Sequence, residues 1–154
     1  MRVLGIAFLF GASIFTGFYI AENRLSILKD YIRIENLLKN IILGIQSENL
    51  SITEIFKNIK KHCDNKTACF IENIDFKNFT DFELSDDKNA NEILKDAFSV
   101  LGKYSAKEQI KELEFCRNRI NELYLKNEKD IFLKAKLSKY SGVFCGMFFV
   151  IILI

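Results

Sequence analysis

Residues 3–21 read VLGIAFLFGASIFTGFYIA, an uncharged run that decides how the rest of the chain is interpreted. A helix needs about 20 apolar residues to cross the hydrocarbon core of a bilayer, and this run has that length. A second uncharged run, YSGVFCGMFFVIILI, fills residues 140–154. The two runs predict an amino-terminal transmembrane helix at residues 1–21, a carboxyl-terminal one at 140–154, and a separate domain at 22–139.

Each run has a competing interpretation. The first run resembles a cleaved secretory signal peptide, but cleavage after Ala21 would place bulky Tyr19 where a small residue is needed. The second run resembles a buried core helix, and at ~1.5 Å per residue it is shorter than a bilayer core of about 30 Å. A snorkelling Lys139 extends it. We therefore expect two anchors, the second of which requires local bilayer thinning or packing against other helices.

The charged residues follow the same partition. The 154-residue chain has 22 Lys and Arg against 20 Asp and Glu, and all of them except Arg2 lie between Glu22 and Lys139. No basic stripe with interleaved aromatic residues occurs in this nearly neutral segment, so we expect no nucleic-acid partner. The four cysteines lack the spacing of a zinc site and are expected to be free thiols.

Small residues recur one helical turn apart in both uncharged runs. In lipid, such pairs let helix backbones approach closely, because packing rather than exclusion of water drives helix association there. The alternative is that apolar helices merely tolerate glycine. We predict six residues as helix-packing positions within the membrane, in contact with each other or with spans of other proteins: Ala7, Gly11, Ser13, Gly17, Gly142 and Gly146.

Basic residues next to the runs predict the side of the membrane on which the domain lies. Loops that carry an excess of Lys and Arg close to a span stay in the cytosol. The opposite side offers only Arg2 and the amino terminus, so we expect a cytosolic domain. The residues that set this orientation are Arg24, Lys29, Lys134, Lys136 and Lys139.

The segment between the runs has the apolar spacing and the start signals of helices. Apolar residues step by four, three, four, three and four from Ile27 to Ile45, which predicts a helix over about 24–46, continuous with the first anchor or separate from it. Capping boxes at Ser51 with Glu54 and at Ser105 with Glu108 predict two helix starts, and Leu50 with Ile55 a hydrophobic staple.

The remaining signals complete the predicted domain. A short helix is plausible near residues 67–74, residues 85–89 are polar like a loop, and Gly102 has the place of a C′ residue that ends the preceding helix. The last helix then reaches the second anchor. The fold class is therefore all-α, an antiparallel bundle of about five to six helices flanked by two transmembrane helices.

No catalytic constellation is present in the sequence. Its one histidine, His62, falls at the end of a predicted helix, and neither a phosphate-binding loop nor a metalloprotease or serine-hydrolase motif occurs. The acidic residues have no ligand spacing. We therefore expect no catalytic, cofactor-binding or metal-binding residues, and a binding or scaffold protein that is not an enzyme.

Several segments in order resemble the stage III sporulation protein AB family of endospore-forming bacteria. The first anchor carries the first segment, and the carboxyl-terminal third carries the others. They are GFYIA at 17–21, Leu101-Gly102, Ser105, Gln109, KYSGV at 139–143, Gly146 and VIILI at 150–154.

The resemblance implies a role in sporulation, in the complex that joins mother cell to forespore. The family is similar to inner-membrane platform proteins of type II secretion and type IV pilus systems. The implied function is a membrane platform on the mother-cell side of the septal membrane. Its partners would be other channel subunits and their secretion-type ATPase, and a homo-oligomer is compatible with this function.

A helical transmembrane sensor and a generic membrane-anchored adaptor are the alternatives. A sensor needs an output domain after its second span, whereas this sequence stops at Ile154. We therefore expect the platform.

Overall fold

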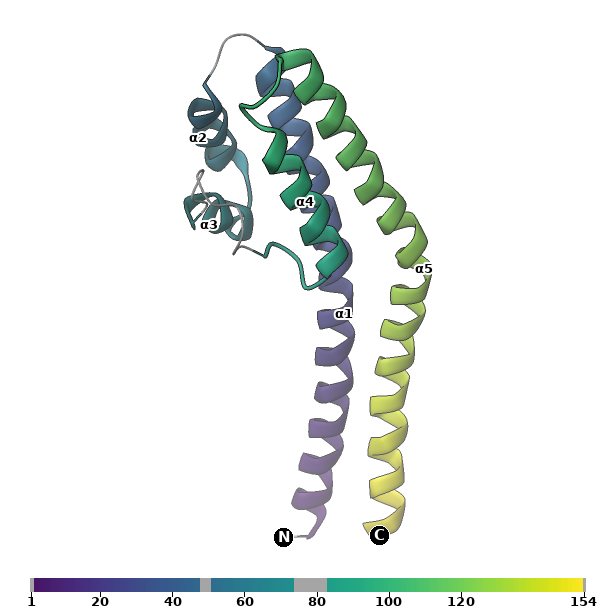
Figure 1. The fold of residues 1–154 in the computed structure, drawn as a ribbon. Helices are drawn as coiled ribbons and strands as arrows, with labels where there is room; N and C mark the ends of the chain where they lie inside the picture. Colours follow the sequence, from purple (N-terminus) through teal and green to yellow (C-terminus); the bar gives the residue numbers. More distant parts are fainter. Residues whose placement is uncertain (1, 48–50, 74–82, 154) are drawn as a thin grey trace. The chain divides into compact units, whose positions relative to one another are not determined.

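The computed structural model describes residues 2–47, 51–73 and 83–153, with the side chains of all except 2–4, 6 and 153. Every element within these ranges is a helix, which confirms the all-α prediction. The five helices, shown in Figure 1, are α1 (Arg2–Gln46), α2 (Ile52–His62), α3 (Asn65–Asn73), α4 (Lys88–Val100) and α5 (Ala106–Leu153). The predicted helix 24–46 is thus continuous with the first uncharged run, and α5 is continuous with the second.

The chain divides into two compact units. The apolar unit comprises Met1–Leu28 and Lys126–Ile154, and the central unit comprises Lys29–Leu125. The helices α1 and α5 contribute to both units, whereas α2, α3 and α4 belong to the central unit alone. The two units are described separately below.

The first capping box forms as predicted. Ser51 is the N-cap of α2, its hydroxyl accepts the Glu54 N–H, and the Glu54 carboxylate accepts the Ser51 N–H at 2.9 Å. Hydrogen bonds from the backbone and hydroxyl of Ser51 hold the pKa of Glu54 below its usual value. The predicted staple includes Leu50, which lies outside the described residues.

The turn between α4 and α5 also matches the prediction. Gly102 follows the C-cap Leu101 and has a φ of 75°, a conformation that favours glycine. Ser105 and Glu108 form the second capping box, in which the Glu108 carboxylate accepts the Ser105 N–H at 3.1 Å. Gln109 closes the turn, because it accepts from the Gly102 N–H and donates to the Tyr104 carbonyl.

The helix limits in the middle of the chain differ from the predicted ones. The short helix expected near 67–74 begins earlier, at Asn65, and ends at Asn73. The polar segment predicted as a loop at 85–89 contains the start of α4 at Lys88, with Asp87 as its N-cap. The buried side chain of Asn91 accepts the N–H groups of Leu84 and Ser85, which fixes the chain before α4. Such side-chain contacts leave no periodic signal in the sequence.

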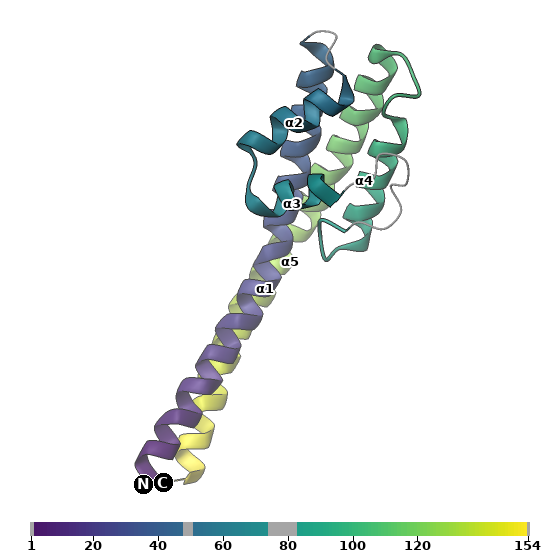
Figure 2. The same ribbon diagram turned by 90° about the vertical axis from the view of Figure 1, so that its left-hand side faces the viewer.

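The core of the central unit lies between its helices. One face of α1 is buried as its spacing predicts, with Tyr31, Ile34, Leu38 and Ile41 each at most 1% exposed. Figure 2 shows α2 and α3 beside this part of α1. Three aromatic rings join the shorter helices to one another, with Phe98 of α4 in contact with Phe56 of α2 and Phe70 of α3.

Candidate functional site: a close-packed pair of apolar helices

The apolar unit consists of two helical segments that run side by side in opposite directions (Figures 1 and 2). Their closest approach is between two glycines. A Cβ atom added to Gly17 would lie 2.8 Å from the Ser138 carbonyl oxygen and 2.9 Å from the Gly142 Cα, and a Cβ added to Gly142 would meet the Gly17 Cα at 2.9 Å. Backbone therefore packs directly on backbone, which only glycine permits at these two positions.

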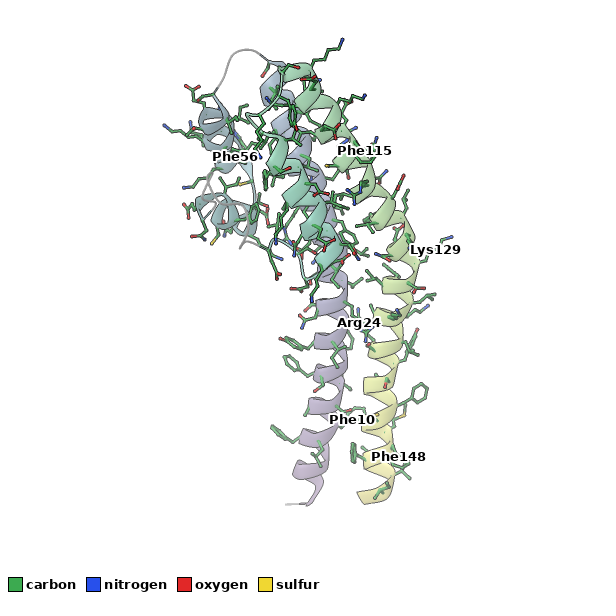
Figure 3. All side chains as sticks on the ribbon, viewed as in Figure 1. Phe10, Arg24, Phe56, Phe115, Lys129 and Phe148 are labelled. Atoms are coloured by element: carbon green, nitrogen blue, oxygen red, sulfur yellow. The ribbon has the colours of Figure 1, made fainter. Side chains whose placement is uncertain are left out.

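Contacts on either side of the glycines extend this interface. The Ser13 hydroxyl donates a hydrogen bond of 2.8 Å to the Gly142 carbonyl. Towards the ends of the chain, the Phe10 ring fills the space over Gly146, where an added Cβ would lie 2.8 Å from a ring carbon. Figure 3 labels Phe10 between the two segments. The hydrogen bond from Ser13 matters because burying a hydroxyl without a partner in an apolar environment costs free energy.

Four of the six predicted helix-packing residues therefore meet in this contact, namely Ser13, Gly17, Gly142 and Gly146. The other predicted pair does not take part. Ala7 and Gly11 are exposed, and a Cβ added to Gly11 would meet nothing within 4 Å.

Two further small residues of the apolar unit were not predicted to pack between the helices. Ala21 and Ala135 are both buried, at 0% and 3% exposure. Ala135 precedes the second uncharged run and was counted with the charged segment. Small residues at positions 135, 138, 142 and 146 follow helical spacing, so a search that ignored the neighbouring lysines would have found it.

The paired contacts define the register of the two segments. Phe10 contacts Gly146, Gly17 contacts Gly142, and the Lys139 ammonium lies 5.1 Å from the centre of the Phe18 ring. Higher residue numbers on α1 therefore pair with lower residue numbers on α5, as expected for an antiparallel pair. Continued by one turn, this register places Ala21 level with Ala135. The end of the first uncharged run is therefore level with Ala135 on α5 rather than with Tyr140.

The basic residues predicted to set the orientation cluster near this level of the apolar unit. Arg24 is exposed, and Lys134 is exposed with its ammonium 3.5 Å from Asp130. Lys136 lies 6.0 Å from the ring centre of Tyr140, and Lys139 is partly covered by Phe18. The fifth residue, Lys29, is exposed in the central unit.

Within the two uncharged runs, many large apolar side chains are exposed on the outer surface of the apolar unit. In the part of the chain that the structure describes, one helix, α5, is long and apolar enough to cross a membrane, and 11% of its apolar window is buried. Phe8, Phe144 and Phe148 are 79%, 67% and 62% exposed (Phe148 is labelled in Figure 3). A core helix of a soluble protein would bury such residues. The first predicted span includes residues 1–4 and 6, whose side chains lie outside the description.

A buried ion-pair network in the central unit was not predicted from the sequence. The Asp30 carboxylate is 0% exposed and accepts hydrogen bonds from Arg33 at 2.6 Å and from Lys66 at 2.8 and 2.9 Å. Arg33 also donates to Asp64 at 2.7 Å. The network ties α1 to α3, and its one local signal was the spacing of Asp30 and Arg33 on one helix face.

Comparison with known proteins identifies a related family. A family model described as stage III sporulation protein AB matches residues 77–154, which are 78 of the 154 residues. The match covers α4 and all of α5. It therefore includes Gly142 and Gly146, the two glycines of the second uncharged run that contact α1. No curated protein and no solved structure matches the chain significantly.

Proposed function

Because the chain belongs to the stage III sporulation protein AB family, which implies a role in sporulation, we propose that it is a non-enzymatic membrane platform subunit of the sporulation complex. The observation that carries this proposal is the apolar unit, in which small residues face inward and large apolar residues face outward. That arrangement suits a helix pair surrounded by lipid, where close backbone packing holds the helices together.

The register supports two spans of matching length. If both helices cross the membrane, the boundary at Ala21 continues to Ala135, so the second span begins about five residues before Tyr140. From there to the end of α5 the helix is long enough, at ~1.5 Å per residue, to approach the ~30 Å of a bilayer core. Lys136 and Lys139 then lie at the boundary, where lysine side chains reach the headgroups. The second uncharged run is short and needs another helix to pack against in the membrane. In this proposal, that helix is the first span.

The central unit is then a cytosolic antiparallel helical bundle on the mother-cell side of the septal membrane. The lysines and Arg24 at the boundary favour this side. By analogy with secretion platforms, its role is to link a secretion-type ATPase to other channel subunits. Its charged, helical surface suits protein contacts, and the family description names no enzymatic activity.

The predicted orientation is tested with a membrane-impermeant maleimide on cells that carry single-cysteine variants. A chain that keeps only Cys69, which is exposed, is expected to react after permeabilisation and not in intact cells. A chain that keeps only Cys116 is the control, and it is expected to react only after denaturation. Cys116 is 3% exposed, and burial raises the pKa of its thiol and so reduces the reactive thiolate. Modification of Cys69 in intact cells would place the central unit outside.

The platform role is tested in a sporulating strain. Deletion of the gene is expected to remove most heat-resistant spores and to leave vegetative growth unchanged. The tagged full chain, solubilised in detergent from sporulating cells, is expected to retain the secretion-type ATPase and channel subunits of the complex. An unrelated membrane protein with the same tag serves as the control. Normal spore numbers would refute the sporulation role, and absence of these subunits would refute the platform role.

A further inference from the structure

The solvent-facing side of α1 in the central unit carries a distinctive set of residues. Two of them are large and apolar, Ile32 and Leu43, which are 45% and 49% exposed. All residues from 29 to 47 are described, and no exposed one among them is acidic. We call this set the α1 face, and the exposed residues from 29 to 47 are Lys29, Ile32, Asn36, Lys39, Asn40, Leu43, Gln46 and Ser47.

A groove lies beside the α1 face, between α1 and α2. It consists of two adjoining hollows of about 470 and 300 Å³, which share Asn40, Ile59 and His62 as lining residues. Its lining includes the buried apolar residues Leu37 and Ile55, and its edges carry amide and basic side chains together with the Asp64 carboxylate, which is paired with Arg33. Such a surface is suited to receive an amphipathic helix.

A helix face of complementary chemistry occurs on α5 of the same unit. Its large apolar residues are Phe115 and Leu125, which are 57% and 60% exposed. Two arginines of the same stretch, Arg117 and Arg119, are half-buried, and Arg119 is paired with Asp96. No exposed residue from 114 to 125 is basic. The exposed residues of this α5 face are Glu114, Phe115, Asn118, Asn121, Glu122 and Leu125.

The two faces match in charge and in spacing. Each has two apolar residues, two asparagines and two charged residues among its exposed residues, the charges are of opposite sign, and the α1 face also has the uncharged Gln46 and Ser47. Ile32 and Leu43 are 11 positions apart, and Phe115 and Leu125 are 10 positions apart, which correspond to about 16 and 15 Å along a helix. In an antiparallel arrangement, Phe115 therefore meets Leu43 when Leu125 meets Ile32.

We propose that copies of this chain associate head to tail. The α5 face of one copy packs antiparallel to α1 of the next copy, against its α1 face and in the groove between its α1 and α2. Within the central unit, α1 and α5 run in opposite directions (Figure 1). Neighbours inserted in one membrane with the same orientation therefore bring α1 and the next α5 together antiparallel. Because the two faces differ, the contact is heterologous and extends into a ring or an array. The orientation of neighbours rests on the proposed membrane insertion, whereas the match of the faces does not.

Cross-linking in membranes tests the contact. Two differently tagged full-length chains without native cysteines are co-expressed, one with Asn40→Cys and the other with Asn118→Cys. A short bis-maleimide is expected to join the two tags. Asn40→Cys alone is expected to give no dimer, because the same face does not meet itself. The control pairs Asn118→Cys with Lys57→Cys, since Lys57 is exposed on α2 and outside the groove lining.

Charge reversal provides the decisive comparison. Lys29→Glu with Lys39→Glu is expected to lower the cross-linked fraction about tenfold, as is Glu114→Lys with Glu122→Lys. Combining the reversed α1 face on one chain with the reversed α5 face on the other is expected to restore the cross-linked fraction. A variant that had lost cross-linking because it failed to fold would not be rescued in this way. Absence of the mixed cross-link, an Asn40→Cys dimer, or a yield insensitive to charge would overturn the proposal. Spore formation is not the readout, so failure here leaves the proposed platform role standing.

Discussion

Replacing Gly17 by leucine is expected to separate the two segments of the apolar unit. The first side-chain carbon alone would lie 2.8 Å from the Ser138 oxygen and 2.9 Å from the Gly142 Cα. Both obstacles are backbone, so no side-chain rotation relieves the clash. Overpacking in a core costs about 1–3 kcal/mol and more where the surroundings are rigid. We expect a loss of about 3 kcal/mol or more, which lowers the population of the closed pair roughly 100-fold.

A disulfide across the interface measures this change. Ala21→Cys and Ala135→Cys, introduced into a chain without native cysteines, are expected to form a disulfide in the membrane under mild oxidation, because both positions are buried and the register of the two segments, continued by one turn, places them at the same level. With Gly17→Leu added, the disulfide yield is expected to fall to background. If the proposed function is correct, the number of heat-resistant spores falls with it.

The matched control for this experiment is Gly11→Leu in the same helix. A Cβ at Gly11 meets nothing within 4 Å, so leucine there adds apolar surface on the outside and leaves the disulfide yield unchanged. Gly17→Ala is expected to lie between the two, because its single added carbon already meets the backbone. Equal yields for Gly17→Leu and Gly11→Leu would show that the glycine contact does not hold the unit together.

Replacing Asp30 by asparagine is expected to destabilise the central unit by about 2 kcal/mol. The substitution keeps the shape of the side chain and removes the charge that Arg33 and Lys66 share. Breaking a buried ion pair costs about 3–5 kcal/mol when the remaining charge stays buried. The side chains of Arg33 and Lys66 are 28% and 45% exposed, so water partly compensates them and the expected cost is smaller.

The thiol of Cys116 reports this loss. It is buried in the same unit, so reaction with a maleimide requires opening of the unit. In a full-length chain that keeps only Cys116, Asp30→Asn is expected to raise the labelling rate roughly 30-fold in detergent, which corresponds to about 2 kcal/mol. Glu72→Gln is the control, because its pair with Lys60 is exposed and is worth at most about 1 kcal/mol. Equal rates for the two variants would contradict the structural role of Asp30.

Local signals made the helix ends predictable. The capping boxes at Ser51 and Ser105 and the C′ glycine at 102 act within four residues, so the side chains that stabilise these ends are adjacent in the chain. The limits of α3 and the start of α4 were less accurate. The segment before α4 is held by Asn91, which acts on Leu84 and Ser85 from the helix that follows them.

The small-residue spacing indicated which helices pack closely and left their register open. Ala7 with Gly11 and Ser13 with Gly17 have the same spacing, yet only the second pair lies in the contact. The choice depends on which face of α1 meets α5, and the residues concerned are more than 100 positions apart. A single sequence contains no local signal for such a pairing.

By itself, the sequence determined that this protein is helical, where three of its helix ends lie, and that it has two uncharged runs suited to lipid. These properties follow from spacing and composition within single turns of helix. The tertiary structure alone decided that Gly17 meets Gly142, that Ala21 and Ala135 are buried, and that Asp30 is buried between Arg33 and Lys66. Each of these depends on a partner from a distant part of the chain, because packing and desolvation are set by the residues that surround a group in space.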